Sequence, residues 1–279
     1  MKRSDINIRD PFVLVHDGKY YLYGTRGPEC WGRGTGLDCY VGTDLENFED
    51  PVEVFTPPIG FWSDKNYWAP EVHEYKGNFY MFVSFKADGV CRGTQILKAD
   101  NPLGPFILHS AGPVTPRDWE CLDGTFYLDP ENGKPYIVFS HEWVQTTDGE
   151  ICALELDNEL WGPIGSPRLL FHASEAPWIK PFREINYVTD GPFVYRNSKG
   201  KLTILWSSFG EKGYVLAMAH SESNSIYGPW KQDPELLFED NGGHGMLFTD
   251  LEGKLRVALH YPNVNLKERP VFIPVDKEI

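Results

Sequence analysis

The sequence predicts an all-β fold, a five-bladed β-propeller, and two observations carry this prediction. Five segments share one design, in which two short apolar strands flank a glycine-containing turn, and nothing in the chain is typical of a long amphipathic helix. The segments recur at blade-sized intervals, so five units account for all 279 residues. We therefore expect residues 1–279 to form a single propeller domain.

The repeated unit is a β-hairpin. Its copies cover residues 10–25, 71–85, 123–141, 190–208 and 244–260. In each copy, apolar and polar residues alternate on both sides of a turn that contains glycine, which is the usual signal of two antiparallel strands. Further short strands are predicted between the hairpins. A hairpin with two outer strands is the four-stranded blade of a propeller.

An acidic residue or a histidine opens every hairpin. These residues are Asp10, Glu71, Asp123, Asp190 and His244. The first strand of a blade lines the central channel, so we expect equivalent positions to form one ring at a channel mouth. Gathered carboxylates repel each other and lose hydration, which favours a functional role. The structural alternative is that they bond backbone amides of neighbouring blades.

A ring of carboxyl groups suits glycoside hydrolysis, because one acid can stay ionised while another is held protonated by its surroundings. The competing use is Ca²⁺ binding, since carboxylate oxygens with a neutral imidazole suit a hard cation. Tryptophans close in sequence to the ring can stack on sugar faces. They are Trp62, Trp68, Trp119 and Trp143, whereas Trp206 and Trp230 are expected to pack between strands.

Composition disfavours several other classes of function. The net charge of −14, without a basic cluster, would repel nucleic acid. The five cysteines are an odd number without CxxC spacing, so we expect free thiols rather than a zinc site or a full disulfide set. No apolar run is long enough to span a membrane, and the first residues carry no apolar leader. We expect a cytoplasmic protein, although an exported protein trimmed of its leader would look the same.

The chain resembles glycoside hydrolase family 43, the inverting five-bladed propeller enzymes. The similarity extends from 9–12 (RDPF) to 242–246 (GGHGM), through 68–71 (WAPE), 122–129 (LDGTFYLD) and 189–192 (TDGP). Each motif alone is weak, but five in order at blade spacing are specific. The resemblance implies an oligosaccharide or polysaccharide side chain as partner, with α-L-arabinofuranosides, β-D-xylosides or β-galactosides as substrates. It also implies chemistry without a cofactor and a structural calcium ion near the propeller axis.

The same resemblance assigns roles to individual residues. Asp10 is similar to the general base, and Asp123 to the acid that raises the pKa of the proton donor. Asp190 falls where the family usually has a glutamate as general acid, and His244 matches a histidine that helps to hold an axial cation or water cluster. Glu71 and the tryptophans Trp62, Trp68 and Trp143 are expected to contact substrate. Loops 26–38, 145–150 and 173–187 are expected to shape the pocket.

Asp190 departs from the family pattern, since its side chain is one methylene shorter than glutamate. Either blade four compensates for the shorter reach, or Glu184, Glu142 or Glu71 donates the proton, or the protein binds sugar without cleaving it. The enzyme rival is a retaining fructosidase of families 32 and 68, which shares Arg-Asp-Pro and Glu-Cys motifs (9–11 and 120–121 here) in a different order. A glycoside phosphorylase is less favoured, because no Arg/Lys cluster is present to hold phosphate.

Overall fold

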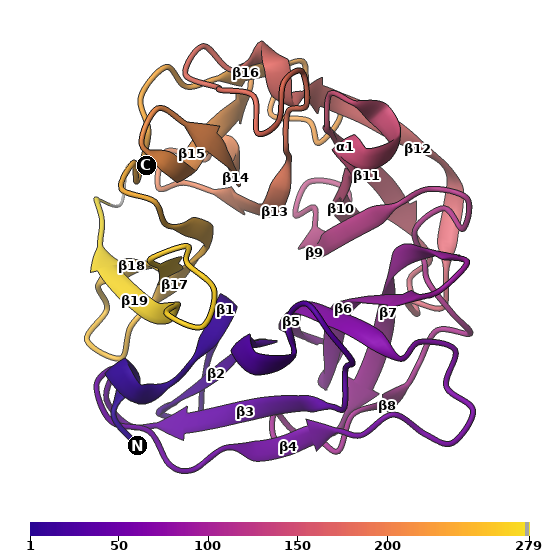
Figure 1. Ribbon diagram of the computed structural model, residues 1–279, viewed down its shortest axis with the longest axis vertical. Coiled ribbons are helices and arrows are strands. Elements are labelled where there is room, and N and C mark those ends of the chain that lie inside the picture. Colours follow the sequence, from indigo (N-terminus) through magenta and orange to yellow (C-terminus); the bar gives the residue numbers. More distant parts are fainter. Residues whose placement is uncertain (277–278) are drawn as a thin grey trace.

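The computed structural model describes residues 1–276 and 279, whose strands form five sheets around one axis (Figure 1). The first sheet contains β1 (Ile8–His16), β2 (Lys19–Arg26), β3 (Leu37–Gly42) and β4 (Val52–Phe55). The second contains β5 (Lys65–Tyr75), β6 (Asn78–Ala87), β7 (Val90–Ala99) and β8 (Ile107–Leu108). The third contains β9 (Cys121–Leu128), β10 (Pro135–His141), β11 (Glu150–Leu156) and β12 (Pro163–His172).

The fourth sheet contains β13 (Asp190–Arg196), β14 (Leu202–Gly210), β15 (Gly213–Ser221) and β16 (Trp230–Gln232). The fifth contains β17 (Gly243–Thr249), β18 (Leu255–Tyr261) and β19 (Arg269–Pro274). The predicted five-bladed propeller and its five hairpins are confirmed, and Figure 1 shows β1, β5, β9, β13 and β17 nearest the axis. The expectation of four strands per blade is wrong for the fifth blade, which has three in the described part of the chain.

The first residues of the chain hold the short fifth blade against the first. The Arg3 guanidinium donates to the carbonyl of Pro270 (3.0 Å), and Arg269 Nε donates to the carbonyl of Ser4 (2.8 Å). The ring is therefore closed by contacts between residues more than 260 positions apart. The only α-helix among the described residues is α1 (Trp143–Thr146), in agreement with the predicted lack of long helices.

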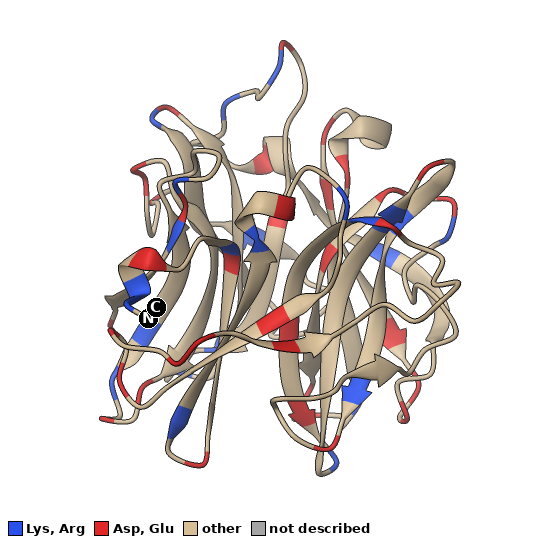
Figure 2. Ribbon diagram, turned by 60° about the horizontal axis from the view of Figure 1, so that its bottom comes forward, with Lys and Arg blue, Asp and Glu red and all other residues tan. Residues whose placement is uncertain are grey.

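Apolar side chains fill the space between the blades. Trp206 and Trp230 are 0% and 8% exposed, as expected for packing residues. All five cysteines are free, which confirms the prediction from their spacing. Figure 2 shows the basic residues of the described part of the chain scattered among the acidic ones. Within residues 1–276 and 279, no helix has the length and apolar character needed to cross a membrane.

A β-bulge interrupts the innermost strand of every blade at the same place. The register shifts after Arg9, Trp68, Leu122, Asp190 and Gly243. The next residue has a positive φ in each case: Asp10 (52°), Ala69 (47°), Asp123 (58°), Gly191 (50°) and His244 (51°). For a residue other than glycine this conformation costs about 1–2 kcal/mol, and such strain gathers at functional sites. The bulges thus mark one ring of equivalent positions.

The bulges correct the sequence prediction of that ring. Asp10, Asp123 and His244 occupy equivalent positions as expected, but Glu71 and Asp190 do not. Glu71 lies two residues beyond the blade-two bulge and pairs with Phe82. Asp190 lies one residue before the blade-four bulge and pairs with Ser207. A motif that starts with an acid does not reveal where the bulge falls, because the bulge adds a residue to the strand.

Polar side chains on the second strands hold the bulges in place. Thr25, Ser84, Ser207 and His260 each accept the backbone N–H of the bulge residue of the next blade. In blade four the amide of Gly191 instead donates to Asp123 Oδ2 (3.0 Å), and the equivalent Ser140 hydroxyl has no partner among the described residues. Blade-to-blade bonding therefore needs only one of the carboxylates, Asp123. The structural alternative does not account for Asp10 or Asp190.

Candidate active site

The bulges arrange the channel mouth in two tiers. The bulge residues Asp10, Asp123 and His244 line a small inner cavity of about 60 Å³. The residues just before the bulges, among them Arg9, Trp68, Leu122 and Asp190, line both this cavity and a wider pocket of about 530 Å³ above it. Three carboxyl groups therefore meet at the floor of a pocket whose size is typical of a small-molecule site.

Asp10 is held as an ionised acceptor. Its Oδ2 accepts a hydrogen bond from the Thr25 hydroxyl (2.6 Å), and its Oδ1 lies 3.2 Å from Nδ1 of His244. Burial acts to raise the pKa of Asp10. The charges of His244 and Arg9 outweigh that effect, so its pKa lies below the ordinary carboxyl value. A carboxylate that stays ionised is suited to accept a proton from water.

His260 contacts Asp10 as a neutral imidazole. The backbone N–H of Asp10 donates to Nδ1 of His260 (3.2 Å), and Nε2 of the same ring faces the Asn263 side-chain oxygen (3.4 Å). Burial and the nearby Arg9 charge lower the pKa of His260 to about 3, so the ring carries no charge near neutral pH. His260 therefore acts on Asp10 mainly by holding its backbone in place through this hydrogen bond, and not by its charge.

The pKa values of Asp123 and Asp190 are shifted upward, in the opposite direction to that of Asp10. Burial is the largest cause that raises the pKa of both carboxyls, with His244 opposing it. The charges of Asp190 and Asp10 raise the pKa of Asp123 further, while those of Glu142 and Asp10 raise that of Asp190. Coupled acids of this kind titrate as a pair. We expect the pair to retain a proton near neutral pH, as a proton donor requires.

His244 lies between the carboxylates. Its Nδ1 is 3.2 Å from Asp10 Oδ1 and 3.7 Å from Asp123 Oδ2. Burial acts to lower its pKa, but Asp10, Asp123 and Asp190 outweigh this and raise it. In the described residues 1–276 and 279, no three His, Cys, Asp or Glu side chains are grouped to hold a metal ion. The axial calcium ion stays a prediction, and no step below depends on it.

The rival proton donors are placed less favourably than Asp190. Glu184 is exposed and does not line the pocket, although its neighbour Arg183 does. Glu142 lines the pocket, but its carboxylate is held by Arg92 Nε at 2.7 Å. Glu71 lines neither cavity, and its Oε2 faces Nε2 of His73 at 2.9 Å. These placements favour Asp190 as the donor.

The expected aromatic contacts divide into two groups. Trp68 and Trp143 line the wider pocket, where Trp68 also stacks under the Arg92 guanidinium at 3.7 Å. Trp62 and Trp119 do not line it. Trp62 donates to Gln95 Oε1 (2.6 Å), and Trp119 stacks on His141 with ring centroids 4.1 Å apart.

Several pocket residues were not predicted from sequence. Trp31, which is 62% exposed, comes from loop 26–38, and Phe182 with Arg183 comes from loop 173–187, so two of the three loops expected to shape the pocket do so. Arg9, Leu122, Val188, Phe209, Tyr214, Asn263 and Asn265 complete the wall. The lengths of the loops between the hairpins could have indicated that Trp31, Phe182 and Arg183 line the pocket. Tyr214 gave none, because it lies within an otherwise apolar strand.

Tyr214 fixes the orientation of Asp190. Its buried hydroxyl donates to Asp190 Oδ2 (3.0 Å) and lowers the pKa of that carboxyl against the larger effect of burial. With Oδ2 occupied, the acidic proton of Asp190 is left to Oδ1. We predict that Tyr214→Phe raises the pKa of Asp190 and moves the basic limb of the pH–kcat/KM profile upward by roughly one unit. A basic limb that does not move, or moves to lower pH, would contradict this role.

Asp123 is predicted to reduce stability at high pH. Burial, with the neighbouring carboxylates, raises the pKa of Asp123 to about 8, so the fold disfavours its ionised form. The free energy of unfolding then falls as pH rises from the ordinary carboxyl range towards 8. Asp123→Asn keeps an acceptor for the Gly191 amide and removes this penalty. We expect its Tm to exceed that of the wild type by a few degrees at pH 9 and to match it near pH 4.

Thermal unfolding followed by circular dichroism at several pH values measures this difference. Asp118→Asn, at an exposed position nearby, provides the control and should show no pH-dependent difference. A variant whose Tm falls below the wild type at pH 9 would show that the ionised Asp123 stabilises the fold instead.

A five-bladed propeller with acidic groups of divergent pKa beneath an aromatic pocket defines the class of propeller glycoside hydrolases. The family model "Glycosyl hydrolases family 43" matches residues 5–273. The chain therefore belongs to glycosyl hydrolases family 43, whose members cleave O-glycosyl bonds with inversion. The resemblance inferred from the blade motifs is confirmed.

Comparisons with individual proteins agree with this family assignment. The endo-arabinase structure from Bacteroides thetaiotaomicron is 42% identical with a TM-score of 0.91, covering 99% of this chain and 96% of that one. An extracellular endo-α-(1→5)-L-arabinanase of Bacillus subtilis is 23% identical, over 57% of this chain and 49% of the relative. An extracellular exo-α-(1→5)-L-arabinofuranosidase of Cellvibrio japonicus is 25% identical, over 57% and 46%. The chain spans about half the length of these two curated relatives.

Proposed function

We propose that this protein hydrolyses α-L-arabinofuranosidic bonds in arabinan-type chains, with Asp10 as base and Asp190 as acid. One observation carries the choice of sugar: the similarity to an endo-arabinase extends at 42% identity over almost the whole of both chains. The pocket supports it, because Trp31, Trp68 and Trp143 offer aromatic surfaces to the apolar faces of sugar rings above the carboxylates.

The reaction is a single displacement. Asp10 accepts a proton from a water molecule while the water oxygen forms a bond to the anomeric carbon. The bond from that carbon to the leaving oxygen breaks, and Asp190 gives its proton to the leaving oxygen, which departs as a hydroxyl group. The new bond forms on the face opposite the broken one, so the configuration is inverted. The carboxyls regain their starting protonation states by exchange with solvent.

Asp123 acts on the donor in this proposal. Its Oδ2 is bonded to the amide of Gly191, the residue next to Asp190, so it fixes the backbone that carries the acid. Its carboxyl is also electrostatically coupled to Asp190, which favours a retained proton on the pair. The acid is thereby kept protonated at a pH where an isolated aspartate would be ionised.

The choice of substrate is tested with 4-nitrophenyl α-L-arabinofuranoside, β-D-xylopyranoside and β-D-galactopyranoside, together with debranched arabinan. We expect the highest kcat/KM on the arabinofuranoside and release of reducing sugar from arabinan. A preference for the xyloside or galactoside would overturn the assigned sugar. Binding of arabinan without hydrolysis of any substrate would favour a sugar-binding propeller instead.

A further inference from the structure

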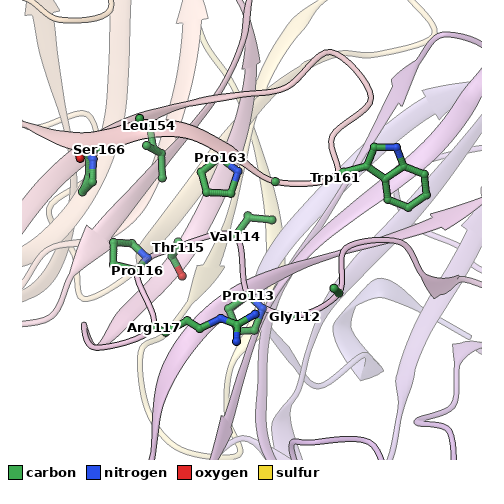
Figure 3. Close-up of a pocket in the computed structure, with 14 residues that line it drawn as sticks. Gly112, Pro113, Val114, Thr115, Pro116, Arg117, Leu154, Trp161, Pro163 and Ser166 are labelled. Carbon is green, nitrogen blue, oxygen red and sulfur yellow. The ribbon is translucent and has the colours of Figure 1, made fainter.

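A second cleft lies between the outer parts of blades two and three (Figure 3). It has a volume of about 400 Å³ and lies between segment 111–117, which follows β8, and segment 161–167, which includes the first residues of β12. Figure 3 shows Trp161 at one end, with Pro163 and Gly112 along it. None of its lining residues lines the catalytic pocket, so it is a separate feature.

Trp161 presents a fixed aromatic face at this cleft. Its side chain is 60% exposed, and one face of the indole stacks on His109 with centroids 4.0 Å apart and planes 18° apart. His109 is anchored through Nε2 to the carbonyl of Glu159 (2.7 Å). The Asp157 carboxylate accepts the backbone N–H groups of Trp161 (3.2 Å) and Gly162 (2.7 Å). The indole is therefore oriented before any ligand arrives, which lowers the entropy cost of binding.

The cleft is also suited chemically to a chain of hydroxyl groups. Its lining contains no Asp or Glu, in a protein with a net charge of −14. Arg117 lies beside Gly112, where a Cβ atom would meet its Nη2 at 3.4 Å, and its side chain is exposed. Its guanidinium group has five N–H donors, which can bond to neighbouring hydroxyls of a sugar.

The cleft adjoins a cavity of about 230 Å³, and the two share the lining residues Ala111, Gly112, Pro113, Pro116 and Arg117. Trp62 lines this second cavity, together with Arg92. The Arg92 guanidinium is itself buried between Glu142 (2.7 Å) and the Trp68 ring (3.7 Å), so Trp62 is the residue of this cavity that can contact a sugar. The cleft and this adjoining cavity, together called the trough below, are lined by Trp161, Arg117 and Trp62, and their combined extent suits several linked sugars.

We propose that this trough is an accessory binding site for a neutral oligosaccharide stretch of the polymeric substrate. The identity of the polymer, arabinan, rests on the proposed function. The Trp161 indole stacks on one sugar ring, and Arg117 donates to its hydroxyls. Holding one part of a polymer raises the effective concentration of the rest at the catalytic pocket. The accessory site therefore improves action on arabinan and leaves action on a small aryl glycoside unchanged.

The test compares Trp161→Ala and Arg117→Gln with Leu251→Ala, an exposed apolar control in blade five. Each variant is assayed on debranched arabinan and on 4-nitrophenyl α-L-arabinofuranoside. We expect kcat/KM on arabinan to fall roughly two- to tenfold for Trp161→Ala and about two- to fivefold for Arg117→Gln. The aryl glycoside should be hydrolysed at the wild-type rate by all three. Both changes are at exposed positions, and circular dichroism verifies that the variants fold.

Affinity for arabinan is measured separately in the Asp10→Asn background by affinity electrophoresis. We expect Trp161→Ala to weaken retardation by the polymer and Leu251→Ala to leave it unchanged. If neither Trp161→Ala nor Arg117→Gln changes polymer affinity or the ratio of polymer to aryl activity, the accessory site is refuted. If no form hydrolyses arabinan or the aryl arabinofuranoside, the proposed function fails instead, and binding to arabinan still tests the trough.

Discussion

Asp10→Asn is expected to lower kcat by at least about a hundredfold and up to about ten-thousandfold, the usual contribution of a general base. Asparagine keeps the size of the side chain and can still accept the Thr25 hydroxyl bond that Asp10 Oδ2 accepts. It cannot take a proton from water. The change also removes a carboxylate next to His244, but that imidazole keeps Asp123 within 3.7 Å. We therefore expect loss of turnover with a folded protein and largely unchanged binding.

Steady-state kinetics on 4-nitrophenyl α-L-arabinofuranoside measure the loss of turnover, and calorimetric titration with arabinotriose measures binding. Asp17→Asn serves as the matched control, because it makes the same change at an exposed turn between β1 and β2. The control should keep the wild-type rate. An Asp10→Asn variant with a rate within a fewfold of the wild type would show that another group activates the water.

Asp190→Asn is expected to produce a loss that depends on the leaving group. Without a proton donor, departure of a sugar hydroxyl should slow by about a hundredfold to ten-thousandfold. A 4-nitrophenolate departs with little help, so the aryl arabinofuranoside should lose much less. The Tyr214 hydroxyl can still donate to an amide oxygen at this position, so the side chain should remain in place.

The ratio of kcat/KM on arabinobiose to that on the aryl arabinofuranoside measures this effect. Glu184→Gln is the control, since Glu184 is the donor that lies nearest to Asp190 in sequence among the rivals considered, and its side chain is exposed. We expect the control to leave the ratio unchanged. Near-wild-type hydrolysis of arabinobiose by Asp190→Asn, or a collapse of the ratio in Glu184→Gln, would assign the acid elsewhere.

The sequence was sufficient to predict the fold because the repeat is encoded locally. Each hairpin combines period-two alternation with a glycine turn, and these signals do not depend on distant contacts. Gly18 and Gly77, for instance, have φ values of 70° and 73° in the turns of the first two hairpins. The same hairpins place Asp10, Asp123 and His244 together, as predicted.

The tiers of the site could not be predicted, because they depend on where each bulge falls. Glu71 and Asp190 both open a hairpin motif, yet one lies beyond its bulge and the other before it. Because of that difference, Asp190 lines the pocket and Glu71 does not. Bulge positions are set by the contacts of second-strand side chains such as Thr25 with the next blade, which are non-local.

The supporting residues of the donor were also beyond sequence reasoning. Tyr214 contacts Asp190 from a strand 24 residues later in the chain, and its neighbours there are apolar core residues. A tyrosine in such a strand is usually a packing residue, and only the three-dimensional arrangement shows its hydroxyl at the carboxylate. Trp62 is the opposite case. It lies close in sequence to the predicted ring, but it does not line the catalytic pocket.

The stereochemistry of the first product shows whether water attacks the anomeric carbon directly, as the roles of Asp10 and Asp190 require. Proton NMR of wild-type enzyme with 4-nitrophenyl α-L-arabinofuranoside, recorded before the free sugar equilibrates, identifies the anomer released. With Asp10 activating water opposite the donor, we expect β-L-arabinofuranose to appear first. Initial release of the α anomer would contradict it, because retention requires a carboxylate to attack the sugar in place of water.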